Sequence, residues 1–354
     1  MTRRWIAAAL AAATMAAPAC AEDFYAGKTI RVLVNFPAGG AADLEARVFA
    51  RHIGKHIAGE PKLTVQNLDG GSGMAGTNLI GRDTARDGLL MGYLTGVGSR
   101  ASLSPETFQV DFRNFEMVGL SPGASIYFAR ADVKPGLNKP EDIVNVDRIF
   151  VGGVGAASSK DMTQRLTLDM LGVRYGYIPG YAGTTGARLA LEKGEIGLYS
   201  ENRPAYQTII APLMKSGVLL PIFYDPSYDG ETLTIAQSVA DLPVKPFHEF
   251  YKSVKGATPA GELWEAYKTI LATNNSFLRC LVMPPGAPKA AVEALRVALA
   301  GLADDRDFIA DSASVLGFTP DYVTNPRLNE QVRRMLEITP AMKAFLERYI
   351  AAGK

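Results

Sequence analysis

Short apolar runs that end in glycine-rich turns and lead into helical periodicity constrain the fold of this chain most. Residues 30–36 (IRVLVNF) are typical of a strand and residues 37–40 (PAGG) of a turn, and apolar residues then recur at helical spacing from Ala42 to Ile57. The same order recurs at residues 63–73, 89–96 and 149–156. Strands that alternate with helices at this interval predict mostly parallel sheets flanked by helices.

Length and composition narrow the class of protein. A chain of 354 residues is long enough for two domains. Its formal net charge of +1 provides no basic field for nucleic acid. Apolar residues make up 47%, and the 35 glycines and 21 prolines are spread along the chain, so we expect a folded globular protein with many short loops and without long disordered segments.

The first residues have the layout of a secretory signal. An apolar run over residues 5–21 follows Arg3 and Arg4 and ends in small residues, which predicts a signal peptide over 1–21, cleavage near Ala21 and a periplasmic location. A cut two residues earlier would leave Cys20 at the terminus, where it could carry lipid. Removal of the segment changes the net charge from +1 to −1 and leaves Cys280 without a partner for an intrachain disulfide.

The glycine turns carry the chemical signal. Glycine lets backbone N–H groups approach a ligand closely, and N–H groups at helix starts carry partial positive charge, so turns at the carboxyl ends of strands predict an anion cradle. Glycine required only by turn geometry is the alternative. Candidate ligand-binding residues from this reasoning are Asp43, Gly71, Ser72, Thr95, Tyr181 and Glu201. For Glu201, which opens the stretch 201–203, a solvated loop is the favoured interpretation and a pocket floor the alternative.

Catalytic, cofactor and metal sites are not expected. Residues 71–76 fit the dinucleotide pattern G-x-G-x-x-G, with Asp87 as the ribose acid, but the adjacent Asp69 would repel a pyrophosphate. His52 and His56 have helical spacing for a metal but lack a third ligand nearby in sequence. Cys280 lies in an apolar run, which favours a buried packing role over a nucleophile.

Several motifs together resemble a known family. They are Gly39-Gly40 followed by Asp43 and Arg47, Asn67 before its glycine loop, the Asp87-Gly88 pair, and PPGAP at residues 284–288. Through nearly the whole mature sequence the chain resembles the solute receptors of tripartite tricarboxylate transporters, also called Bug-type receptors.

The resemblance implies a two-lobed periplasmic binding protein of type II-like architecture, with a hinge between the lobes. It also implies that backbone N–H groups of two loops hold a ligand carboxylate. On this chain those loops supply Phe36, Pro37, Ala38, Gly39, Gly40, Gly153, Gly155, Ala156, Ser158 and Ser159. Four positions depart from the family pattern: Asn35 replaces an apolar residue or proline, Asp69 a proline, Ala182, also a candidate contact, a frequent lysine, and Gly197 a common acid.

These observations predict an extracytoplasmic receptor for a small organic carboxylate, with di- or tricarboxylates favoured. We expect a monomer without cofactor that delivers its ligand to integral-membrane permease subunits. Lobe one is expected over residues 22–122 plus 225–354 and lobe two over 123–224, with hinges at 121–125 and 224–227. The alternatives are a secreted hydrolase or lyase acting on a carboxylate, with His248 as its base, and a ligand sensor for a signalling partner.

Overall fold

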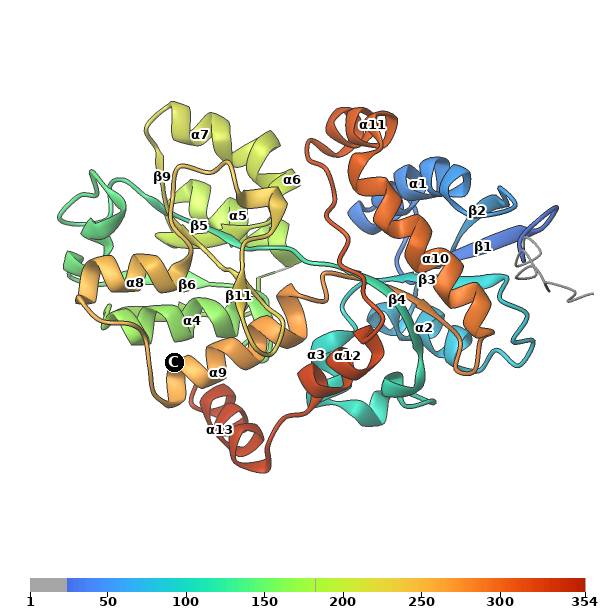
Figure 1. The fold of residues 1–354 in the computed structure, drawn as a ribbon. Coiled ribbons are helices and arrows are strands. Elements are labelled where there is room, and N and C mark those ends of the chain that lie inside the picture. The colour runs from blue at the N-terminus through green and yellow to red at the C-terminus, as the bar shows by residue number, and fades with distance from the viewer. Residues whose placement is uncertain (1–23, 182, 354) are drawn as a thin grey trace, which may run out of the picture.

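Each half of the molecule is organised by a five-stranded sheet with helices on both faces (Figure 1). The computed structural model describes residues 24–181 and 183–353. The predicted signal segment, its cleavage site and Cys20 lie outside the described residues. The α/β class, with its sheets flanked by helices, that the strand, turn and helix pattern predicts, and the two-lobed architecture that the family resemblance implies, are confirmed.

The first sheet has the strand order β2-β1-β3-β12-β4. Its strands are β1 (Thr29–Val34), β2 (Lys62–Asn67), β3 (Leu90–Leu94), β4 (Glu116–Ser121) and β12 (Arg279–Met283). Only β12 runs against its neighbours, so the sheet is mixed but mostly parallel. Side chains alternate along the strands. Leu281 of β12 therefore packs in the core on one face, and Cys280 is fully buried in the core on the other.

Two groups of helices cover this sheet. One face carries α1 (Ala41–Ile53), α10 (Lys289–Gly301) and α11 (Arg306–Leu316), and the other carries α2 (Met74–Gly81), α3 (Gly98–Leu103) and α12 (Leu328–Leu336). α10 begins directly after Pro288, which is its N-cap residue.

The second sheet has the order β7-β6-β8-β5-β9, and β5 is its one antiparallel strand. Its strands are β5 (Ile126–Arg130), β6 (Ile149–Gly152), β7 (Tyr175–Ile178), β8 (Leu198–Glu201) and β9 (Leu219–Tyr224). One face carries α4 (Ser159–Leu171), α8 (Phe247–Lys255), α9 (Glu262–Ile270) and α13 (Pro340–Ala351). The other carries α5 (Gly183–Lys193), α6 (Arg203–Ala205) and α7 (Ala211–Lys215). A small hairpin, β10 (Ser227–Tyr228) with β11 (Leu233–Thr234), follows β9.

The lobe boundaries stay a prediction, and the packing leads us to propose an amendment. Residues 247–271 and 340–351 fall in the part of the chain assigned above to lobe one, yet Phe247, Trp264 and Leu346 lie in the core beside the second sheet. We therefore propose that α8, α9 and α13 belong to lobe two. The chain then crosses between the lobes near residues 122–125, 271–278 and 337–339 (Figure 1).

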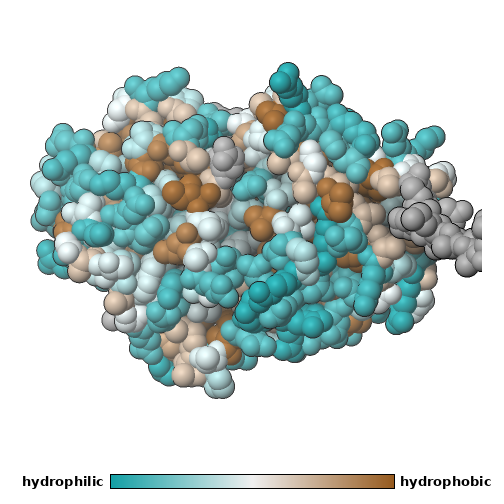
Figure 2. All heavy atoms as spheres, viewed as in Figure 1, coloured by the Kyte–Doolittle hydropathy of each residue, from teal (hydrophilic) through white to brown (hydrophobic). Residues whose placement is uncertain are grey.

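The visible surface is mostly hydrophilic, and its apolar side chains form separate small patches (Figure 2). Among the described helices, none combines the length and the apolar character needed to cross a bilayer.

Candidate functional site

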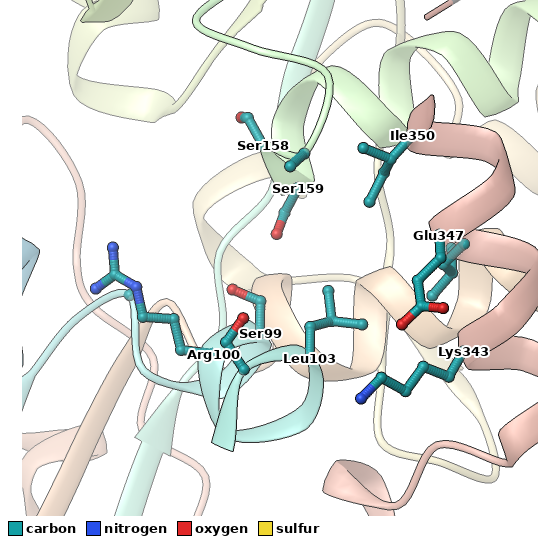
Figure 3. Close-up of a pocket in the computed structure, with 12 residues that line it drawn as sticks. Ser99, Arg100, Leu103, Ser158, Ser159, Lys343, Glu347 and Ile350 are labelled. Carbon is teal, nitrogen blue, oxygen red and sulfur yellow. The ribbon is translucent and has the colours of Figure 1, made fainter. Parts of the chain in front are cut away.

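A pocket of about 490 Å³ lies between the two lobes. It collects Ser99 and Arg100 from α3, Ser158 and Ser159 from the start of α4, and Lys343 and Glu347 from α13 (Figure 3). This volume lies within the range that small-molecule sites occupy. The pocket therefore brings the loop after β3 in one lobe to face the loop after β6 in the other.

The first-lobe loop is folded around a buried carboxylate. The N–H of Gly39 donates to Oδ2 of Asp43 at 2.8 Å, and Nε of Arg47 donates to the same oxygen at 3.0 Å. Burial favours the neutral acid, but the hydrogen bonds from Arg47, Gly39 and Asn67 outweigh it and hold the pKa of Asp43 below its usual value. Asn67 also donates to the carbonyl oxygen of Phe36 at 3.0 Å. Asp43 and Asn67 therefore fix the shape of this loop.

Asn35, which departs from the family pattern, ties three segments of the first lobe together. Its buried amide exchanges two hydrogen bonds of 3.0 Å with the backbone of Thr95. It also donates to the carbonyl oxygen of Gly73 and to the hydroxyl of Thr77, both at 3.3 Å. The Asn35 side chain thereby fixes the ends of β1 and β3 and the start of α2 relative to one another.

The second-lobe loop repeats the arrangement of the first. The N–H of Gly155 donates to Oδ2 of Asp161 at 2.8 Å, and the hydroxyl of Tyr177 donates to the same oxygen at 2.7 Å. Burial raises the pKa of Asp161 in spite of these hydrogen bonds. Gly39 and Gly155 were predicted as ligand donors, but the N–H of each donates to an aspartate of its own lobe. The donors that remain beside the pocket in lobe two are therefore those at the start of α4.

The Asp161 carboxylate packs so closely on Gly153 that no side chain fits at this position. Replacing Gly153 with alanine therefore tests whether the shape of this loop matters for ligand binding. A β-carbon built on Gly153 would overlap the Asp161 carboxylate, which must then leave the Gly155 N–H. We expect Gly153→Ala to weaken binding of a carboxylate that stabilises the wild type by at least about tenfold in calorimetric titration, or about 1.4 kcal/mol. Gly155→Ala is the matched control, because it adds the same methyl group to a glycine of the same loop at a place where no atom lies within 4 Å of the added β-carbon. Wild-type affinity in Gly153→Ala would contradict the role of this loop.

Glu201 joins two cations at the carboxyl end of β8. Its carboxylate lies 3.4 Å from Nζ of Lys160 and 3.3 Å from Nη1 of Arg188, which come from opposite faces of the sheet. Glu201 is only 3% exposed, so of the two sequence interpretations the solvated loop does not describe it. Burial lowers the pKa of Lys160 although Glu201 and Asp161 oppose this shift.

Four further predicted residues are Ser72, Thr95, Tyr181 and Ala182, and the structure describes the side chains of only some of them. Tyr181 lies against the second loop, where its N–H donates to the carbonyl oxygen of Gly153 at 3.1 Å. Ala182 and the side chain of Ser72 lie outside what the structure describes. Thr95 precedes the pocket residue Gly96, and its hydroxyl donates to the carbonyl oxygen of Leu278 at 2.9 Å.

The predicted residues therefore meet the pocket only in part. Ser158 and Ser159 line it, whereas residues 36–40, Gly71 and residues 153–156 do not. The role of these residues in ligand binding stays a prediction. Sequence reasoning missed Lys160, Arg188 and the contribution of α13. Only Lys160, adjacent to a predicted loop, had a local signal that could have identified it.

His52 of α1 and His56, in the short 3-10 turn that follows α1, each lie beside a carboxylate of the α11 region. Nε2 of His52 is 2.8 Å from Asp311, and Nε2 of His56 is 2.8 Å from Asp305. These pairs join α1 to α11 at the surface. Within the described residues, no group of three or more His, Cys, Asp or Glu side chains is placed to hold a metal ion.

Comparison with curated proteins finds homologues with partial overlap. No protein-family model matches the chain. A UPF0065 protein from the TAR-I ttuE-ttuC' intergenic region of Agrobacterium vitis is 28% identical over 204 residues, covering 56% of this chain and 58% of that protein. Protein BugT of Bordetella pertussis is 40% identical over 76 residues, 22% of each chain. The matched segments thus span less than two thirds of these relatives.

Solved structures cover nearly the whole chain. A TctC solute-binding protein from Polaromonas has a TM-score of 0.64 at 20% identity and covers 93% of this chain and 99% of its own. A Rhodopseudomonas palustris protein with adipate has a TM-score of 0.59 at 17% identity, covering 92% and 97%. The periplasmic binding protein BugD has a TM-score of 0.57 at 20% identity, covering 92% and 98%. The chain is therefore a homologue of UPF0065 and Bug proteins with the fold of periplasmic solute-binding proteins, and the resemblance seen in its motifs is confirmed.

Proposed function

We propose that this homologue of the UPF0065 and Bug proteins is an extracytoplasmic receptor that binds a small organic carboxylate between its lobes. It then delivers the ligand to an integral-membrane permease of the tripartite tricarboxylate type. The proposal is supported by structural neighbours that are a TctC solute-binding protein and the periplasmic binding protein BugD, and by a third neighbour solved with adipate. In this proposal the protein acts in the periplasm after cleavage near Ala21, and it binds and releases its ligand without chemical change.

The start of α4 is the observation that carries the proposal. α4 has 13 residues and begins at Ser159, and the first N–H groups of a helix lack partners within the helix and carry partial positive charge. Ser158 and Ser159 line the pocket at this point and add two hydroxyl donors. A carboxylate there would receive hydrogen bonds from lobe two while α3 of lobe one faces it across the pocket.

A thermal-shift series of mono-, di- and tricarboxylates tests the proposal. A carboxylate at 100 times its dissociation constant is expected to stabilise the folded protein by about 2.7 kcal/mol. The matched uncharged amide of each acid is the control, since it keeps the shape of the ligand and removes the charge. Absence of stabilisation by every carboxylate, or equal stabilisation by acid and amide, would overturn the proposal.

The two alternatives predict different outcomes in the same samples. A hydrolase or lyase would convert the stabilising carboxylate, which mass spectrometry of the small molecule would detect. Its suggested base, His248, lies on α8 and is not among the residues that line the pocket. A sensor would bind the ligand equally well but would not restore uptake when supplied to cells that carry the permease and lack the receptor.

A further inference from the structure

Arg165 is the largest fully buried side chain among the described residues, and it is held between two tyrosine rings. Its guanidinium carbon lies 4.9 Å from the ring centre of Tyr177 and 4.8 Å from that of Tyr349. Stacking on aromatic faces keeps a guanidinium planar and oriented. The direction of the Arg165 side chain is therefore set by β7 on one side and by the C-terminal helix α13 on the other.

The oriented arginine reaches the loop that follows β6. Nη2 of Arg165 donates to the carbonyl oxygen of Ala156 at 2.7 Å, a charge-assisted hydrogen bond within the loop 153–159. Tyr177, which stacks on Arg165, also donates to Asp161, the carboxylate that accepts from Gly155. Arg165 thus contacts the loop directly at Ala156, and through Tyr177 it is also connected to the Asp161 carboxylate that holds Gly155.

α13 is fixed to the second lobe by a buried side chain and by a hydrogen bond to α4, so that it can hold Arg165 in place. Leu346 is fully buried in the core of the second lobe, and the hydroxyl of Tyr349 donates to Asp169 of α4 at 2.6 Å. The same helix lines the pocket with Lys343 and Glu347 (Figure 3). α13 therefore contacts the pocket directly and holds the loop opposite it through Arg165.

We infer that α13 sets the position of the loop 153–159 through the stacking of Tyr349 on Arg165, which makes Arg165 and Tyr349 positioning residues for the ligand site. The effect on ligand binding rests on the proposed function, whereas the effect on the loop does not. When Tyr349 no longer holds the guanidinium, Ala156 loses its donor and the loop exchanges between positions. Ligand-binding affinity then falls because the donors at the start of α4 are no longer preorganised.

Hydrogen exchange of the full-length protein without ligand tests the inference. We expect Tyr349→Leu to speed exchange of the 153–159 amides by about tenfold or more, because the hydrogen bond that it weakens involves a charged group. Exchange over residues 36–43 of the first lobe should stay unchanged. Tyr349→Phe is the matched control, since it removes the hydroxyl that donates to Asp169 but keeps the ring over the guanidinium and the buried Leu346 that also anchors α13. Because the ring holds Arg165, loop exchange in this variant should match the wild type.

Arg165→Lys is the second test, since it keeps the charge and removes the planar fork. It should reproduce the loop exchange of Tyr349→Leu even if that variant is globally destabilised. Unchanged exchange at 153–159 in Arg165→Lys, or an equal effect of Tyr349→Phe, would overturn the inference. In both disruptive variants a carboxylate that stabilises the wild type should bind about tenfold more weakly. If the loop responds but no carboxylate binds the wild type, the proposed function fails while the role of α13 stands.

Discussion

Replacing Arg279 with methionine is expected to lower the free energy of unfolding by about 3 to 5 kcal/mol. Arg279 lies on β12 and pairs with Glu45 of α1, and both side chains are at most 5% exposed. Removal of the arginine leaves a carboxylate buried beside Tyr93 without its counter-ion. Urea unfolding at pH 7 measures the change.

A double variant separates the lost pair from the stranded charge. Glu45→Met combined with Arg279→Met removes both ions together, and hydrophobic replacement of a buried pair is often neutral or stabilising. It should therefore recover most of the stability that Arg279→Met loses. A single variant within 1 kcal/mol of the wild type would show that water reaches Glu45 and that the pair is not buried in solution.

The pattern of strands and helices was accessible from sequence because it is written in local periodicity. The strand predicted over residues 30–36 is β1, and the apolar run around Cys280 is the buried strand β12. The assignment of later helices to a lobe was not accessible. The apolar stripe of α9 shows that one face is buried, but nothing local shows that it packs on α4 rather than on the first sheet.

Between about pH 4 and pH 7, Asp225 is expected to make the protein less stable as the pH rises. It is fully buried, and burial raises its pKa to about 7, although hydroxyl donation from Tyr267 at 2.7 Å and Tyr127 at 3.1 Å opposes the shift. An unfolded aspartate titrates near pH 3.9, so in this interval the folded chain holds a proton that the unfolded chain has lost. The protonated group therefore contributes on the order of 4 kcal/mol of stability below pH 4, this contribution falls as the unfolded state loses its proton, and the loss is complete above pH 7, where the folded group ionises as well.

Asp225→Asn isolates this contribution. The amide oxygen can still accept from the tyrosine hydroxyls, and the side chain no longer titrates. Carboxylates with lowered pKa, such as Asp305, give the opposite pH dependence in both proteins, so the difference between wild type and variant reports Asp225 alone. The free energy of unfolding should therefore differ less between pH 5 and pH 8 in the variant than it does in the wild type. Parallel pH profiles of the two proteins would rule out the buried, protonated aspartate.

The candidate site was predictable only where its residues follow a strand directly. Ser158 and Ser159 come after the glycine turn of β6, and both line the pocket. The contacts of Arg165 with Tyr349 and of Arg279 with Glu45 join residues separated by 184 and 234 positions, which no local pattern reveals. The role of the two aspartates that accept from the glycine loops was also hidden, because Asp43 was expected to contact the ligand and Asp161 was not singled out.

In the lobe assignment that we propose, the three crossings of the chain leave its described ends on different lobes. Tyr25 is buried in the first lobe, whereas α13 carries the last described residues on the second (Figure 1). Any rotation of one lobe toward the other must therefore change the distance between the two ends. A donor fluorophore fused before residue 24 and an acceptor fused after residue 353 would report lobe closure as energy transfer, without labelling the pocket or altering a residue that lines it.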